Sequence, residues 1–146
     1  MSQDKVEVVR TAWDAFVERG IEATFQFWSE DCVFEDPPEM PDGGVHVGHA
    51  GVAEAVRNFG EVWGDLTYEP GEFIDAGDDQ VTAVIGLRGE GRGSQAPLLT
   101  EVAYLFELRA GKVTRGRVFT SREQAVQIAH LEDAAPRDSN VPYHRL

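Results

Sequence analysis

The segment Val33-Phe34-Glu35-Asp36-Pro37-Pro38 sets a carboxylate at the end of an apolar run. Asp36 falls on the same alternating face as Phe34, and the two prolines stop the expected strand directly after it. A carboxylate among aromatic side chains is poorly hydrated, and such groups are candidates for proton transfer. Asp36 is therefore a candidate general base. The structural alternative stays open, because an Asp before prolines can also end a strand and bind loop amides.

Aromatic residues form a second candidate group, the walls of an apolar pocket. They recur at helical spacing in the first half of the chain, and one more lies in an expected late strand. The proposed ligand-binding residues are Trp13, Phe16, Trp28, Phe34, Phe59, Trp63, Phe106 and Val118. The same pattern is typical of an ordinary core. In a cone-shaped fold both interpretations hold, since the innermost core positions are also the pocket wall.

Hydrophobic periodicity predicts the elements that would position these residues. Helices are expected over 2–19, over a short segment that contains Ile21, Phe25 and Trp28, and across Val52 to Trp63. Between the second and third of these helices we expect a strand around Cys32 to Asp36 and then a loop over 39–48. The second half predicts strands over 66–75, 80–90, 99–109 and 112–120, with a bulge at Pro70-Gly71, and a final helix over 121–131. Helices followed by an antiparallel meander indicate an α+β class. We expect one domain over residues 1–131 and a polar tail over 132–146.

Composition argues against several partners. The chain has 26 acidic and 13 basic residues, a formal net charge of −13. Nucleic acids and anionic membranes attract basic surfaces, so we expect neither as a partner. No apolar run is long enough to span a membrane, and no signal peptide pattern begins the chain, so a cytoplasmic location is expected. The single cysteine, Cys32, excludes an internal disulfide and is expected to be buried filler.

The element order and four short motifs resemble the nuclear transport factor 2-like superfamily, in its SnoaL-like and ketosteroid-isomerase-like branch. The motifs are Phe34-Glu35-Asp36-Pro37, Gly48-His49, Gly111-Lys112-Val113 and Arg122-Glu123-Gln124-Ala125, within residues 3–131. The resemblance implies a cone-shaped, curved, mostly antiparallel sheet wrapped around the N-terminal helices. It does not decide function, because the superfamily holds isomerases, cyclases, epoxide hydrolases, dehydratases and non-catalytic binders.

The resemblance also implies roles for single residues. In ketosteroid isomerases a Glu-Asp-Pro motif supplies the general base, and Asp36 matches it. Those enzymes stabilise an enolate with a tyrosine on the first helix and a protonated aspartate on a late strand. Trp13 matches the tyrosine. We choose the register that keeps Val102, Tyr104, Phe106 and Leu108 on the inner face, and in this register Tyr104 matches the aspartate. The other register turns Ala103 inward and leaves no donor there.

Two functions remain open at this point. The first is a cofactor-free isomerase or cyclase that uses Asp36 and Tyr104 on an apolar cyclic ketone or polyketide-like substrate. The second is a non-catalytic ligand-binding or dimerisation module. Epoxide hydrolysis is less favoured, because Val118 stands where the resemblance would require an aspartate. We expect no cofactor and no metal, since His46 and His49 follow no recognised ligand pattern.

A homodimer joined through the sheet is also expected. Alternation places charged and apolar residues together on the outward face, among them Glu101, Glu107, Arg115, Arg117 and Phe119. Such a mixed face is more easily explained when it is buried against a second copy. Glu35 alternates away from Asp36 and is expected to be a surface or interface charge.

Overall fold

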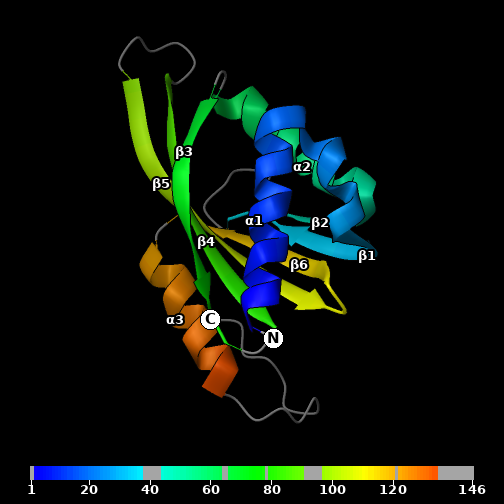
Figure 1. The fold of residues 1–146 in the computed structure, drawn as a ribbon. Coiled ribbons are helices and arrows are strands. Elements are labelled where there is room, and N and C mark those ends of the chain that lie inside the picture. Colours follow the sequence, from blue (N-terminus) through cyan, green and yellow to red (C-terminus); the bar gives the residue numbers. More distant parts are fainter. Residues whose placement is uncertain are drawn as a thin grey trace.

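The computed structural model describes residues 2–37, 44–63, 66–77, 79–90, 97–120 and 122–134. Its elements in chain order are α1 (Ser2–Arg19), the 3-10 helix η1 (Ile21–Phe27), β1 (Trp28–Glu35), β2 (Val45–Val47), α2 (Gly48–Trp63), β3 (Leu66–Asp75), β4 (Gln80–Glu90), β5 (Pro97–Arg109), β6 (Lys112–Phe119) and α3 (Arg122–Ala134) (Figure 1). The α+β class expected from the sequence is confirmed, and apart from β2 the elements follow in the expected order.

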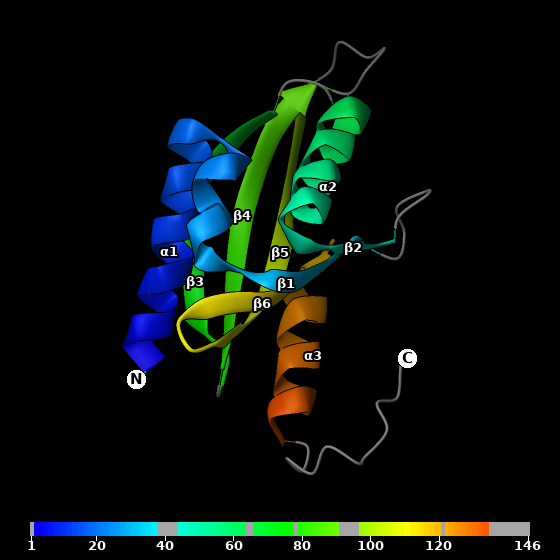
Figure 2. The ribbon, with the colours of Figure 1, turned by 90° about the vertical axis from the view of Figure 1, so that its right-hand side faces the viewer.

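The six strands form one sheet in the order β2-β1-β6-β5-β4-β3. β1 and β6 are parallel, and every other neighbouring pair is antiparallel. In Figure 2, β1 and β6 run across the long strands β4 and β5, so the sheet is strongly curved. α1 contacts β3 and β4, and α2 contacts β1 and β2, on the concave side. α3 contacts β4, β5 and β6 from the opposite face.

Alternation along the strands divides the buried residues between the two faces. Val102 and Phe106 of β5 belong to the large core inside the curved sheet, which also contains Val9, Trp28, Cys32, Phe34, Val52, Ala83, Ile85 and Val118. Ala103 points the other way and packs with Val84 and with Ala125 of α3. The register with Tyr104 on the inner side is therefore the one the fold adopts, because Tyr104 packs against the large core.

Turn residues end the elements where the sequence indicates. Gly20 has φ 97°, and its N–H donates to the carbonyl of Phe16 at 2.9 Å, which ends α1. Ala110 and Gly111, with φ 54° and 80°, join β5 to β6 in a tight hairpin. The pairing of β3 with β4 shifts between Glu69 and Glu72, which confirms the bulge expected at Pro70-Gly71.

Several boundaries differ from the expectation. Trp28 was expected in the second helix, but its extended backbone (φ −103°, ψ 139°) makes it the first residue of β1. Residues 45–47 were expected in a loop, but they pair with β1 as the edge strand β2. Three residues are too few for alternation to reveal a strand, so only the pairing identifies it. α3 continues to Ala134, beyond the expected end at residue 131.

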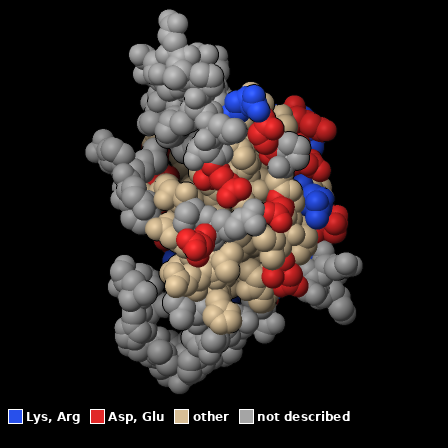
Figure 3. All heavy atoms as spheres, turned by 90° about the vertical axis from the view of Figure 1, so that its left-hand side faces the viewer, with Lys and Arg blue, Asp and Glu red and all other residues tan. Residues whose placement is uncertain are grey.

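The surface reflects the negative charge of the chain. In Figure 3, acidic side chains are spread over the described part of one face, and basic side chains are few. No helix among the described residues is long and apolar enough to cross a bilayer.

Candidate functional site

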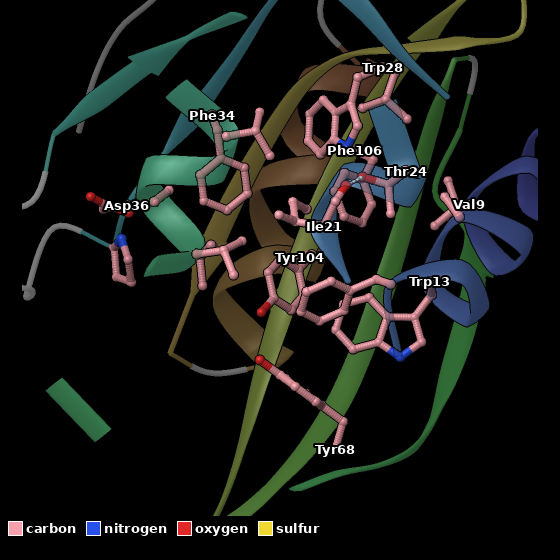
Figure 4. Close-up of a pocket in the computed structure, with 18 residues that line it drawn as sticks. Val9, Trp13, Ile21, Thr24, Trp28, Phe34, Asp36, Tyr68, Tyr104 and Phe106 are labelled. Atoms are coloured by element: carbon pink, nitrogen blue, oxygen red, sulfur yellow. Dashed lines mark hydrogen bonds between the residues drawn. The ribbon is translucent and has the colours of Figure 1, made fainter. Parts of the chain in front are cut away.

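A cavity of about 90 Å³ lies between the helices and the concave face of the sheet (Figure 4). This volume is several times the roughly 15 Å³ that one water needs. Its walls come from α1, η1 and α2 on one side and from β1, β3, β5 and β6 on the other. The lining residues are Val9, Ala12, Trp13, Phe16, Ile21, Thr24, Trp28, Phe34, Asp36, Pro37, Val52, Ala55, Val56, Tyr68, Tyr104, Phe106, Val113 and Val118. Most of them are apolar, so the cavity suits a largely apolar molecule.

Aromatic rings line the cavity in two connected groups. Trp13 lies 5.4 Å from Tyr68 and 5.6 Å from Tyr104 between ring centroids. Trp28 lies 6.1 Å from Phe34 and 6.0 Å from Phe106. Edge-to-face and tilted contacts at these distances stabilise aromatic clusters. The rings are therefore held by one another, and the cavity they enclose is preformed.

Asp36 lies directly after β1 and lines one side of the cavity, and its side chain is only 7% exposed. Its Oδ2 accepts a hydrogen bond from the backbone N–H of Gly44 at 3.2 Å and lies 2.8 Å from Nε2 of His46. Among the described residues no group donates to Oδ1. One carboxylate oxygen is thus anchored, and the other is left to accept a proton.

His46, on β2, lies behind Asp36. Its other ring nitrogen, Nδ1, is 3.2 Å from Oε1 of Glu54 on α2. Burial lowers the pKa of His46, but hydrogen bonds to Asp36 and Glu54 and the charges of both carboxylates outweigh it, so the pKa lies above the ordinary value of 6.5. His46 is therefore charged over a wider pH range than a free histidine.

Two phenols lie on the sheet side of the cavity. Figure 4 shows the hydroxyl ends of Tyr68 and Tyr104 close together, away from Asp36 at the cavity edge. Burial raises the pKa of Tyr68, and burial together with Tyr68 raises the pKa of Tyr104 far above its ordinary value. No hydrogen bond to another described residue engages either hydroxyl. Both phenols are therefore neutral donors that a ligand oxygen can use.

The structure brings most of the sequence-predicted site residues together. Asp36 and Tyr104 line the same cavity, as do Trp13, Phe16, Trp28, Phe34, Phe106 and Val118. The side chains of Phe59 and Trp63 lie outside the described part of the structure. Among the described residues, no group of three or more His, Cys, Asp or Glu side chains is arranged to hold a metal ion.

The sequence analysis missed three residues of this site. Tyr68 alternates with Thr67 and Glu69 in β3, and that alternation could have placed it on the inner face. His46 was weighed only as a metal ligand, and Glu54 was not considered. Their contact depends on the packing of α2 against β2, which no local pattern reveals.

Comparisons with known proteins agree with this architecture. The family model for the SnoaL-like domain matches residues 9–116. No curated protein matches the sequence. The structure of TerC, co-crystallised with polyporic acid, superposes with a TM-score of 0.70 at 22% identity, covering 86% of this chain and 98% of TerC.

Two further solved structures show the same fold. An NTF2-like protein from Burkholderia xenovorans LB400 has a TM-score of 0.68 at 23% identity, covering 89% of this chain and 98% of the other. A hypothetical protein with a ketosteroid isomerase-like fold from Catenulispora acidiphila DSM 44928, in complex with trimethylamine, has a TM-score of 0.63 at 19% identity, covering 89% and 98%. Identities this low show a shared fold. With the family match over most of its length, this chain belongs to the SnoaL-like domain family and has the nuclear transport factor 2-like fold.

Proposed function

We propose that the protein is a cofactor-free isomerase or cyclase that binds an apolar cyclic ketone or polyketide-like molecule and acts on it by acid–base chemistry. The observation that carries this proposal is the arrangement of Asp36. One of its oxygens is anchored by Gly44 and His46, while the residue lines an apolar cavity that also contains two neutral phenols. A base and at least one donor in one pocket are the minimum for enolisation.

Asp36 and the two phenols have separate roles in the proposed reaction. Oδ1 of Asp36 takes a proton from the carbon next to the ketone. The electron pair of that C–H bond forms a double bond to the carbonyl carbon, and the π electrons of the carbonyl group move onto its oxygen to give an enolate. The enolate oxygen accepts hydrogen bonds from Tyr104 and Tyr68, whose stabilisation is larger for the developing charge than for the ketone. Asp36 then returns the proton to another carbon of the same conjugated system. The base is regenerated, so no cofactor takes part.

The placement of these groups constrains the ligand. Asp36 lies at the cavity edge, and the tyrosine hydroxyls lie apart from it along the sheet (Figure 4). Because the carbon that loses its proton and the carbonyl oxygen are two bonds apart, the carbonyl group itself must lie between Asp36 and the phenols, with its acidic carbon toward Asp36, its oxygen toward the phenols and the rest of the ligand against the aromatic rings. The solved structure of TerC with polyporic acid, which has a similar fold, supports a cyclic carbonyl compound as the ligand class.

A non-catalytic binding module is the second candidate, and one observation favours it. Asp36 also anchors the chain beyond β1, because its backbone N–H donates to the carbonyl of Gly44 at 3.0 Å and its side chain accepts from the N–H of Gly44. An aspartate with this role can be needed for folding alone.

Turnover of 3-cyclohexen-1-one, which gives a conjugated enone on isomerisation, distinguishes the candidates. Asp36→Asn keeps the shape and the anchoring oxygen but removes the proton acceptor, so we expect a loss of about 10²-fold or more in kcat. Asp31→Asn makes the same chemical change at an exposed position of β1 and should leave turnover unchanged. No turnover above the buffer rate in the parent protein, together with a melting temperature that Asp36→Asn lowers by many degrees, would support the binding module.

A further inference from the structure

Glu54, His46 and Asp36 form a continuous polar chain from the surface to the cavity. The Glu54 side chain is 56% exposed, whereas those of His46 and Asp36 are 10% and 7% exposed. The imidazole bridges the two carboxylates at 3.2 Å through Nδ1 and 2.8 Å through Nε2. A charged imidazole donates from both nitrogens, but a neutral one donates from only one. Only the charged form can therefore satisfy both carboxylates.

Gly51 permits the contact between His46 and Glu54. A Cβ atom at Gly51 would lie 2.8 Å from the backbone carbonyl carbon of His46 and 3.1 Å from its Cβ, closer than ordinary contact. The absence of a side chain lets α2 lie directly on β2. Glu54 follows three residues later on the same side of the helix, which places its carboxylate beside His46. The arrangement thus depends on the backbone as well as on the three side chains.

We propose that His46 is a positioning residue for Asp36, held in place by Glu54, and that the orientation of the base depends on the charge of His46. This inference rests on the proposed function of Asp36. Its chemistry is simple: His46 and Gly44 occupy Oδ2, so the carboxylate cannot rotate without losing two hydrogen bonds, and Oδ1 stays available for the substrate. No proton passes from Asp36 through His46 to Glu54 during turnover, because Asp36 returns to the substrate the proton that it removes.

The surroundings of His46 support a dependence on pH. In the part of the chain that the structure describes, the charged groups that act on His46 are Asp36 from the end of β1 and Glu54 from α2. Both favour the charged imidazole, and together they keep its pKa above 6.5 despite burial. The bridge is therefore present below pH 6.5, and it is lost as the pH rises through the raised pKa.

Two variants at His46 test the positioning role through kcat and KM for 3-cyclohexen-1-one. His46→Leu removes the donor to Asp36, and we expect kcat to fall by up to about 10²-fold with KM nearly unchanged, as a displaced catalytic group does. His46→Gln retains one N–H donor without a charge, so it should recover part of kcat and lose the alkaline limb of the pH profile. An equal kcat in the parent protein, His46→Leu and His46→Gln would overturn the inference. If Asp36→Asn abolishes turnover in the same assay, the proposed function would survive that result.

Glu54 provides a test that does not depend on activity or on replacing a buried residue. The imidazole resonances of His46, followed by NMR against pH, should titrate above 6.5 in the parent chain and at a lower pH in Glu54→Gln, which keeps the hydrogen-bond acceptor and deletes the charge. Glu18→Gln, exposed on α1, is the matched control and should leave the titration unchanged. Identical titration of His46 in the parent chain and Glu54→Gln would overturn the role of Glu54, whatever the turnover assays show.

Discussion

The rings of Tyr104 and Phe106 are stacked, with centroids 5.7 Å apart and an interplanar angle of 1°. The two residues are neighbours on the inner face of β5, so the strand itself places one ring beside the other. Phe106 also contacts Trp28. The phenol of Tyr104 is therefore fixed by ring packing rather than by a hydrogen bond, which leaves its hydroxyl free for a ligand.

Removing the hydroxyl of Tyr104 should weaken catalysis without disturbing the wall. Tyr104→Phe keeps the stack on Phe106, and we expect kcat for 3-cyclohexen-1-one to fall by only about 10-fold, because Tyr68 can still donate to the enolate. Tyr68→Phe should behave similarly. The double variant removes both donors and should lose about 10³-fold, more than the roughly 10²-fold product of the two single losses. If the loss of kcat in the double variant equals the product of the two single losses, or if the double variant is fully active, the two phenols do not donate to the same enolate oxygen.

Filling the space beside the aromatic wall should reduce ligand binding. A Cβ atom at Gly116 of β6 would lie 3.0 Å from ring atoms of both Phe34 and Trp28 and 3.2 Å from Phe106. Gly116→Ala must therefore displace rings that line the cavity, at a cost of about 1–3 kcal/mol in the free energy of unfolding. We expect weaker binding of 2-naphthol, measured by fluorescence titration, with a lower melting temperature. Unchanged affinity would mean that the rings adjust without narrowing the cavity.

The fold follows from the sequence more directly than the site does. The long segments, such as α1 and the strands β3 and β4, have their bounds close to those expected, since each is a long hydrophobic pattern with turn residues at its ends. β2 has only three residues, and its extended conformation depends on its pairing with β1. The inward direction of Tyr104 needed the three-dimensional register, because a shift of one residue exchanges it with Ala103.

The polar chain behind Asp36 shows why the site is harder to predict. Asp36 and His46 are ten residues apart, and His46 and Glu54 are eight apart, on three different elements. No helical or strand period connects such positions. Their contact arises from the close approach of α2 to β2 at Gly51.

The charge of His46 should make stability depend on pH. Because its pKa in the folded protein lies above the unfolded value of 6.5, the charged bridge stabilises the fold fully below pH 6.5, and this contribution is lost as the pH rises through the folded value. Urea unfolding at a series of pH values from 6.5 upward should show a free energy of unfolding that declines as the pH rises. In His46→Gln the decline should be smaller, because no group at that position changes its protonation. Parallel pH curves for the two proteins would contradict a charged bridge.

We also predict a homodimer joined through the convex face of the sheet. There Arg115 lies 2.8 Å from Glu35 and 3.2 Å from Glu107, and Arg117 lies 3.1 Å from Glu107, so these four charges are paired within the chain. Paired charges are less costly to bury against a partner than isolated ones. Sedimentation equilibrium at micromolar concentration should give about twice the chain mass of 16.1 kDa. A single 16.1 kDa species would exclude this dimer.

The cavity should prefer neutral ring compounds over phosphorylated ones. Among the described residues its lining includes no Lys or Arg, and the one charged residue among them, Asp36, is acidic. An anionic ligand would meet this carboxylate and the negative charge of the chain, whereas an apolar ring gains about 25 cal/mol per Å² buried, before the costs of binding. A thermal-shift comparison should therefore show stabilisation by 2-naphthol and by steroid or aromatic ketones, and none by nucleotides or sugar phosphates. Asp36→Asn should bind 2-naphthol nearly as well as the parent chain, because burial of the ring supplies most of the affinity. Stronger stabilisation by a sugar phosphate than by any ketone would require a different ligand class for this cavity.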